Sequence, residues 1–166
     1  MIKAIVCIDE NWAIGKDNDL LFHLPADMKM FKETTQNKIV FCGYNTLLSF
    51  PGQKPLKNRS TICLCPAEIE RDDCYCIHTF EEAVRLLKEL GKTQDVFIIG
   101  GAMVYQSFLP YFDEVLVTKV YADGNGTVFF PNLDENPDFQ RVLNGNIILD
   151  SGYTINFNTY KRHTDE

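Results

Sequence analysis

Short apolar runs that recur along the chain, with helical patterns between them, constrain the fold more than any other feature of the sequence. They are rich in Ile, Val, Phe and Cys, and they occupy residues 2–8, 38–43, 60–65, 95–100 and 114–120. A continuous apolar run is typical of a β-strand that is covered on both faces. Helices that connect parallel strands provide this cover. We therefore predict a single α/β domain over residues 1–166, in which about four helices flank a central, mostly parallel, twisted β-sheet.

The connecting segments carry the signals of helices, turns and one further strand. Residues 26–35 have helical apolar spacing. Thr79, with Glu82 three positions later, forms a capping box at the start of another helix. Residues 153–160 alternate apolar and polar side chains, as in an antiparallel C-terminal strand near a sheet edge. Asp9–Asp19 is polar and turn-rich, so we predict a loop that can act as a lid.

Size and charge exclude several classes of protein. A chain of 166 residues fits one domain with a substantial core. The net charge of −7 argues against a nucleic-acid partner, because such proteins neutralise phosphates with Lys and Arg. No apolar run is long enough to span a bilayer, and the N-terminal run is too short for a signal peptide. We therefore expect a cytoplasmic protein without a membrane partner.

The six cysteines raise the question of a metal site. Cys63 with Cys65, and Cys74 with Cys76, form two C-x-C pairs, whereas structural zinc sites usually use C-x2–4-C spacing. Residues i and i+2 of a strand face the same way, so each pair is simply a stripe of small apolar side chains. We expect no metal, because these spacings match zinc sites poorly, and no disulfides, because the chain lacks a secretory signal.

Asp27 is an acidic residue on an otherwise apolar helix face. On a 3.6-residue period, one face of the helix carries Leu24, Asp27, Met28 and Phe31, and we expect this face to point inward. A buried, unpaired carboxylate is costly, so its position needs a reason. Asp27 either supports the helix dipole at the first turn or anchors a ligand through paired hydrogen bonds to an amidine-like edge.

Two glycine turns follow predicted strands and precede helices. Gly43–Thr46 offers backbone N–H groups at a helix start, where anions bind. Gly100 and Gly101 allow a phosphate or a ring to approach the backbone closely. Neither turn has the G-x-G-x-x-G pattern of a dinucleotide fingerprint.

Taken in order, these residues resemble the dihydrofolate reductase family over nearly the whole chain. The matching elements are the first apolar run, Trp12–Gly15, Leu24–Asp27, Phe31–Lys32, Gly43 with Thr46, Arg59, Ile99–Gly101 with Tyr105, Thr118 and Phe130–Pro131. Each motif is common by itself, whereas their order and spacing together are specific. The resemblance implies a monomeric, NADPH-dependent oxidoreductase of one-carbon metabolism and a target of antifolates. In this reaction NADPH delivers a hydride to C6 of dihydrofolate, N5 gains a proton, and tetrahydrofolate results.

The resemblance also implies roles for the substrate site. Asp27 pairs with the 2-amino group and N3 of the pterin, and Thr118 supports its carboxylate. Asp27 then favours protonation of N5 electrostatically, with water as the proton carrier, and direct transfer from Asp27 is the second choice. Arg59 holds the glutamate α-carboxylate of the substrate in a bidentate pair. The other substrate-binding residues are Ile5, Cys7, Met28, Phe31, Lys32, Phe50, Leu56, Ile99 and Tyr105.

The cofactor site implied by the resemblance joins the two glycine turns to neighbouring residues. In this family the peptide bond between the two adjacent glycines is cis, so we expect a cis bond at Gly100–Gly101. The implied NADPH-binding residues are Cys7, Ile14, Gly15, Gly43, Tyr44, Asn45, Thr46, Leu64, Cys65, His78, Gly100, Gly101, Ala102, Met103, Val104 and Tyr105.

The sequence departs from the family pattern at several of these positions. Phe22 stands where bacterial members usually carry a Trp that binds a water near the catalytic acid. Tyr44 replaces an Arg that often grips the cofactor 2′-phosphate, and Cys65 replaces a hydroxyl residue near the same phosphate. His78 either compensates for them or is a solvated residue before a helix cap. Thr127 replaces an Asp that ties a distal loop to the lid, so the closed lid is expected to be less favoured.

Two other functions remain open at this stage. One is a reductase of the same fold that acts on a ribosylamino-pyrimidine, against which Asp27 and Arg59 argue. The other is a non-catalytic folate- or nucleotide-binding protein of the same fold. The presence of Asp27, Phe31, Arg59, Thr118 and the glycine pair favours a working enzyme over this alternative.

Overall fold

The computed structural model describes residues 1–16 and 20–164. Its central sheet is mostly parallel, ends in an antiparallel C-terminal strand and is accompanied by helices α1–α4, which confirms the predicted fold class. The internal contacts divide the chain into two compact units. The first unit contains Met1–Ala4 and Thr34–Phe112, and the second contains Ile5–Glu33 and the chain from Asp113 onward. Strand β1, Ile2–Ile8, contributes residues to both.

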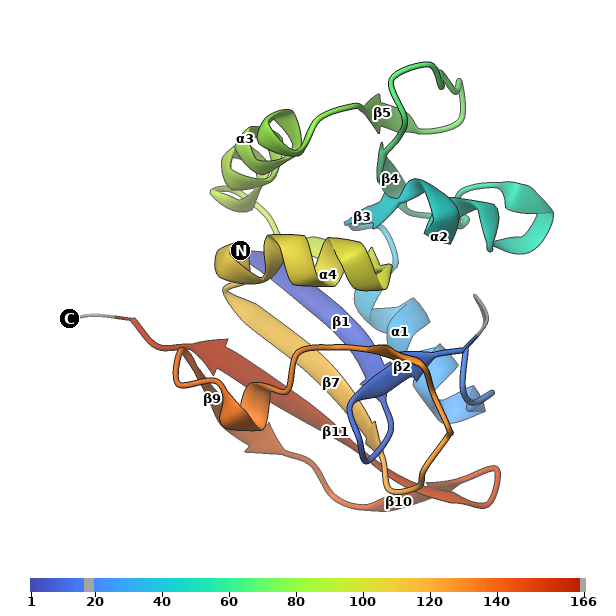
Figure 1. Ribbon diagram of the computed structural model, residues 1–166, viewed down its shortest axis with the longest axis vertical. Helices are drawn as coiled ribbons and strands as arrows, with labels where there is room; N and C mark the ends of the chain where they lie inside the picture. The colour runs from blue at the N-terminus through green and yellow to red at the C-terminus, as the bar shows by residue number, and fades with distance from the viewer. Residues whose placement is uncertain (17–19, 165–166) are drawn as a thin grey trace. The chain divides into compact units, whose positions relative to one another are not determined.

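The first unit contains the parallel strands (Figure 1). Their order is β1, β6, β3, β4, β5, and every neighbouring pair is parallel. The register places Ile39 of β3 opposite Val96 of β6 and Ser60 of β4. The strands after β1 are β3 (Ile39–Gly43), β4 (Ser60–Leu64), β5 (Tyr75–Ile77) and β6 (Val96–Gly100). Four of the predicted apolar runs, residues 2–8, 38–43, 60–65 and 95–100, therefore lie in the parallel part of the sheet, whereas the run 114–120 forms β7 of the second unit.

Helices lie between these parallel strands or directly after the last of them, as the sequence pattern predicts. They are α2 (Tyr44–Leu48), α3 (Phe80–Gly91) and α4 (Ala102–Phe108), with 3-10 turns at Pro51–Gln53 and Leu109–Tyr111. Thr79 caps α3, because its hydroxyl oxygen accepts a hydrogen bond from the backbone N–H of Glu82 at 3.2 Å. Ala83 and Leu87 bury the inner face of this helix.

The second unit is built on antiparallel pairs. Strand β11 pairs with β7 along one edge and with β9 and β10 along the other, and Figure 1 shows β7 and β11 side by side. A small separate sheet joins β2 to β8. The elements are β2 (Ala13–Gly15), α1 (Pro25–Thr35, whose last two residues belong to the first unit), β7 (Glu114–Val120), β8 (Val128–Phe129), a 3-10 turn (Leu133–Glu135), β9 (Phe139–Asn144), β10 (Ile148–Asp150) and β11 (Tyr153–Arg162).

Each unit has an apolar cluster of its own. In the second unit Leu24, Val120 and Ile155 are buried together, and Cys7 and Phe22 pack against them. In the first unit the buried residues are Cys42, Leu47, Cys63 and Cys65. All six cysteines are free thiols, and the two C-x-C pairs pack as small apolar side chains.

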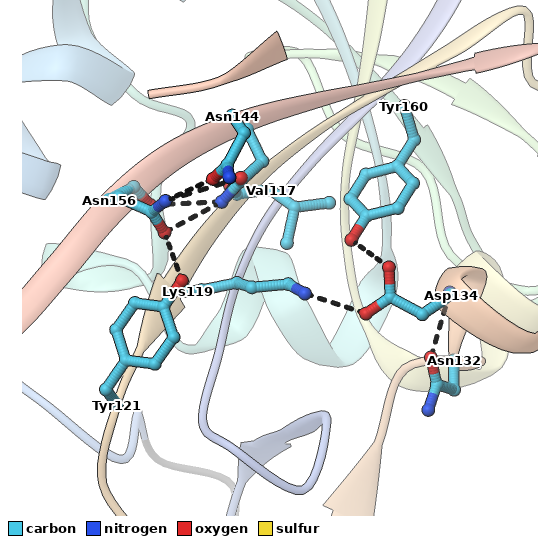
Figure 2. Close-up of polar contacts among 9 residues, drawn as sticks. Val117, Lys119, Tyr121, Asn132, Asp134, Asn144, Asn156 and Tyr160 are labelled. Carbon is cyan, nitrogen blue, oxygen red and sulfur yellow. Dashed lines mark hydrogen bonds and ion pairs between the residues drawn. The ribbon is translucent and has the colours of Figure 1, made fainter. Parts of the chain in front are cut away.

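The polar face of β11 is buried, which the alternating pattern did not reveal. Asn156 and Asn158 are only 1% and 2% exposed. Figure 2 shows Asn156 accepting a hydrogen bond from Tyr121 at 3.0 Å and donating one to Asn144 at 2.7 Å. Asn158 donates to Asn156 at 2.9 Å and to the carbonyl of Val117 at 3.3 Å. Because strands flank β11 on both edges, its amide side chains find partners inside the protein.

The structure corrects several sequence predictions. The predicted loop Asp9–Asp19 contains a short strand, β2, and its residues 17–19 lie outside the described residues. Strands β9 and β10 were not predicted, because their apolar runs are short, and most of their apolar side chains other than Phe139 are exposed. Met28 is 59% exposed, so the face of α1 that carries Asp27 is not fully covered by protein. In the described part of the chain, no helix has the length and apolar character needed to cross a membrane.

Candidate functional site

Asp27 lies in the first turn of α1, where side chains from two strands hold its carboxylate. Thr118, at the centre of β7, is fully buried. Its hydroxyl donates a hydrogen bond to Oδ1 of Asp27 at 2.7 Å. The thiol of Cys7, on β1, donates a second hydrogen bond to the same carboxylate. The structure thus brings together three residues that the sequence analysis placed in the substrate site.

Several opposing effects set the pKa of Asp27, and their sum raises it above its ordinary value. Burial is the largest cause, because it disfavours the charged form. The hydrogen bond from Thr118 lowers the pKa, the negative charge of Asp150 raises it, and the hydrogen bond from Cys7 lowers it. Burial raises the pKa of the Cys7 thiol far above its usual range, so Cys7 stays protonated and remains a donor. Asp27 is therefore a carboxyl group poised to pair with a hydrogen-bonding cationic or amidine edge.

Of the predicted site residues on α1 around Asp27, two are exposed and one is partly covered. Met28 and Lys32 are exposed and Phe31 is partly buried, whereas Ile5 of β1 is buried. An exposed methionine beside a partly buried aromatic ring provides an apolar surface that a flat ligand can cover.

Asp9, a fully buried carboxylate, organises the start of the predicted lid loop. It is 1% exposed. Its Oδ1 accepts hydrogen bonds from the backbone N–H groups of Asn11 at 2.8 Å and Ala13 at 2.9 Å. Its Oδ2 accepts one from Gly124 at 2.9 Å. Asp9 therefore ties the loop that follows β1 to the distal loop at Gly124.

The sequence analysis missed this role of Asp9. The available signal was an acidic residue directly after an apolar strand, but its distant partner cannot be read from the sequence.

A further hydrogen bond between the two loops runs from the backbone N–H of Thr127 to the carbonyl of Gly15 at 2.9 Å. This bond uses no side chain, so the substitution of Asp by Thr at position 127 leaves it intact.

In the first unit, the two glycine turns lie close together. A cis peptide bond joins Gly100 to Gly101, as the resemblance implies. A Cβ atom at Gly101 would lie 3.0 Å from the hydroxyl oxygen of Thr46, and one at Gly43 would lie 3.1 Å from Val104. Residues at both turns must therefore be small, and helices α2 and α4 begin directly after them.

Arg59 lies directly before β4 and is held by short hydrogen bonds. Its Nε donates to the hydroxyl of Thr35 at 3.0 Å, and its Nη1 donates to the carbonyl of Lys57 at 2.7 Å. Phe50 and Leu56 are partly buried residues of the same unit. These bonds fix the guanidinium plane in one orientation.

The cations near Tyr44 and Cys65 are paired with acids. One ring nitrogen of His78 lies 2.9 Å from Oε1 of Glu70, and the other contacts the carbonyls of Cys65 and Pro66. The hydrogen bond to Glu70 raises the pKa of His78. Arg71, which the sequence analysis did not single out, makes a bidentate pair with Asp73, with both N···O distances at 2.8 Å. A side-chain hydrogen bond also links Arg71 to Tyr44.

The remaining predicted site residues divide between the two units. Those in the second unit are Ile14 and Gly15, both on β2. Those in the first unit are Asn45 on α2, Leu64 on β4, Ile99 on β6, and Ala102, Met103 and Tyr105 on α4. Among the described residues, no group of three or more His, Cys, Asp or Glu side chains is arranged to hold a metal ion.

Comparisons with known proteins all point to one family. The family model of dihydrofolate reductase matches residues 1–162. The dihydrofolate reductase of Bacillus subtilis (strain 168) is 34% identical over 137 residues, which cover 82% of this chain and 79% of that protein. The dihydrofolate reductase of Staphylococcus haemolyticus is 33% identical over 136 residues, which cover 81% of this chain and 80% of that protein. A solved structure of the dihydrofolate reductase from Enterococcus faecalis, complexed with NADP(H) and RAB-propyl, has a TM-score of 0.84 and 31% identity and covers 99% of this chain and 97% of that one.

Proposed function

Because the chain belongs to the dihydrofolate reductase family, we propose that Asp27 is the residue that anchors the pterin ring while dihydrofolate is reduced to tetrahydrofolate. The family makes this chain an oxidoreductase that uses NADPH. The observation that carries the role of Asp27 is its setting. A carboxylate in the first turn of α1 is held by Thr118 and Cys7 and has a raised pKa.

The glycine turns of the first unit fit the cofactor. Helices α2 and α4 begin directly after β3 and β6, which are neighbouring parallel strands. Ligands of parallel sheets bind outside the carboxyl ends of the strands. The N-cap residues, Gly43 and Gly101, have no side chain that could occupy the backbone N–H groups at the helix starts. Phosphate oxygens can therefore accept hydrogen bonds there, and NADPH supplies the hydride when it is bound.

Asp27 would act on the substrate in two ways. Its two oxygens accept hydrogen bonds from the 2-amino group and N3 of the pterin, which fixes the ring for transfer at C6. Its negative charge favours the protonated form at N5, while water carries the proton. Thr118 would hold Oδ1 of Asp27 in place during this step, because the Thr118 side chain is fully buried and donates its hydrogen bond to that oxygen.

Arg59 and the exposed face of α1 would hold the rest of the substrate. The guanidinium of Arg59 uses its Nε and Nη1 hydrogens on Thr35 and Lys57. A guanidinium carries its N–H donors in a planar fork that matches a carboxylate, and we propose that Arg59 binds the glutamate α-carboxylate in this way. Met28 and Phe31 would cover the benzoyl and pterin rings, which accounts for a methionine that is otherwise 59% exposed.

Cations beside Tyr44 would contact the cofactor 2′-phosphate. His78 carries its charge more readily because of Glu70, and Arg71 is hydrogen-bonded to Tyr44. Both cations are already paired with acids, so we expect them to favour NADPH over NADH less strongly than an unpaired Arg at position 44 would.

We also propose that the chain acts as a monomer in the cytoplasm. The six free thiols fit a reducing compartment. Light scattering coupled to size-exclusion chromatography would measure the mass, and a dimer mass would contradict the monomer.

The test is NADPH oxidation that depends on dihydrofolate, measured beside NADH at equal concentration. The variant Asp27→Asn should lose about a hundredfold or more of the turnover rate at pH 7, the range expected when a group that promotes proton transfer is removed. Asp138→Asn, an exposed acid of the same unit, is the matched control and should retain the full rate. Near-full turnover by Asp27→Asn would refute the proposed role. Tight binding of folate without turnover by the wild-type chain would instead favour a non-catalytic binding protein.

A further inference from the structure

The start of helix α1 has no N-cap side chain of its own. Leu24 precedes the first helical residue, and its side chain cannot accept a hydrogen bond from the helix, as Ser, Thr, Asp or Asn would. Pro25 has no N–H group, so the N–H of Ala26 is the first donor that needs a partner. This donor lies one residue before Asp27.

Asp150 supplies the missing acceptor from a distant part of the chain. Its Oδ2 accepts a hydrogen bond from the N–H of Ala26 at 2.8 Å, across 124 positions of sequence. Asp150 is the last residue of β10, and the turn to β11 uses positive φ angles at Ser151 and Gly152.

A second contact holds the same hairpin against the segment before the helix. The ring of Tyr153, the first residue of β11, packs edge-on against Phe22, with 4.8 Å between the ring centroids. The β10–β11 hairpin therefore contacts the chain on both sides of Leu24, at Phe22 and at Ala26. Leu24 is itself buried against Val120 of β7 and Ile155 of β11.

We propose that Asp150 is a positioning residue for the reduction, which caps α1 from outside the helix and places a second negative charge beside Asp27. The inference rests on the proposed role of Asp27. A carboxylate at a helix N-terminus is favourable for the helix, whereas the same charge is unfavourable for a second carboxylate nearby. One side chain thus fixes the first turn and opposes ionisation of the acid that the turn carries.

The groups that face Asp27 come from three elements. Cys7 on β1 and Thr118 on β7 donate hydrogen bonds that lower the pKa of Asp27, and the charge of Asp150 on β10 raises it. Cys7 remains a neutral thiol because its own pKa is strongly raised. Asp150 is therefore the charged neighbour whose removal should move the titration of Asp27 to lower pH.

Two substitutions separate the cap from the charge. Asp150→Asn keeps an oxygen that can accept the hydrogen bond from Ala26 but removes the charge. Asp150→Ala removes both. We expect both variants to lower the titration midpoint of Asp27, because each removes the negative charge that opposes its ionisation. Only Asp150→Ala should also lower the melting temperature, by about 2–4 °C, because the helix loses its cap.

The midpoint is best measured in the free enzyme by carbon-13 NMR of labelled aspartate carboxyl groups, with the Asp27 signal assigned from Asp27→Asn. The pH profile of hydride transfer in single turnovers is the second readout. Asp138→Asn is the control and should move neither. An Asp27 midpoint that stays unchanged in both Asp150 variants would overturn the proposal, as would loss of stability without a midpoint shift. If the NMR midpoint moves but the rate profile does not, Asp150 acts on Asp27 as inferred, and the catalytic role proposed for Asp27 is what fails.

Discussion

Replacing Asp27 with Asn should stabilise the protein while it removes activity. The pKa of Asp27 is raised in the folded chain, chiefly by burial, so the folded state disfavours the ionised carboxylate. Between the ordinary Asp value of about 3.9 and the raised value, the folded chain binds more protons than the unfolded chain. Stability therefore falls as pH rises through this window and stays lower above it. Asn carries no charge, so the variant does not lose stability as pH rises through this window.

The substitution preserves the hydrogen bond from Thr118. The hydroxyl of Thr118 donates to Oδ1 of Asp27, and an Asn side chain offers the same carbonyl oxygen. Each unit by which the pKa is raised corresponds to about 1.4 kcal/mol, and a chain of this size changes its melting temperature by about 2–4 °C per kcal/mol. At pH values above the window, Asp27→Asn should thus melt about 3–6 °C higher than the wild type for each pH unit by which the pKa is raised.

The assay is differential scanning calorimetry of both chains from pH 4 to pH 8. The difference in melting temperature should be small at pH 4, grow through the window and level off above it. Asp138→Asn, which changes an exposed acid, should show no such trend. Equal melting temperatures at every pH, or a less stable Asp27→Asn chain at pH 8, would refute the reasoning that Asp27 is held at a cost to stability.

Three further substitutions test the packing around this site. Thr118→Val should raise the pKa of Asp27 further and reduce turnover at pH 7 by about tenfold or more, because a hydrogen bond to a charged group contributes about 1.5–3 kcal/mol; Thr118→Ser should retain most of the rate. Gly126→Ala should destabilise the chain by about 1–3 kcal/mol in urea unfolding, since the added Cβ would lie 2.5 Å from that of Ala13. Leu24→Ala should cost about 2–5 kcal/mol in the same measurement, because Leu24 is 2% exposed in the core of the second unit.

The parts of the fold that could be predicted are those whose signal is local. The apolar runs that form β1, β3, β4, β6 and β7 are continuous in the sequence. The helix cap at Thr79 depends on a residue only three positions away. The short strands β2, β9 and β10 lack such a signal. Strand β2 has three residues inside a polar segment, and β10 has three residues that are largely exposed. Their pairing depends on partners far along the chain, which apolar patterning does not encode.

The same limit applies to the candidate site. The motif around Asp27 and the glycine pair could be named from the sequence, and the contact of Asp27 with Thr118 and the cis bond at Gly100–Gly101 are present in the structure. The acceptor for Ala26 could not be named, because Asp150 lies 124 positions away. The exposure of Met28 was predicted wrongly, because helical periodicity identifies an apolar face but not whether protein covers it.

Two acids of the second unit, Asp9 and Asp27, look alike in the sequence and differ in what surrounds their oxygens. Both adjoin apolar segments, and both would be costly to bury without partners. Both oxygens of Asp9 accept hydrogen bonds from backbone N–H groups of two loops. Asp9 therefore holds the two loops together. Asp27 is held by the side chains of Thr118 and Cys7 on neighbouring strands, while the adjacent face of its helix stays open at Met28. A carboxylate with side-chain partners on neighbouring strands and an uncovered neighbour can still accept a ligand. This difference, rather than burial alone, distinguishes the acid that we propose binds substrate from the acid that supports the fold.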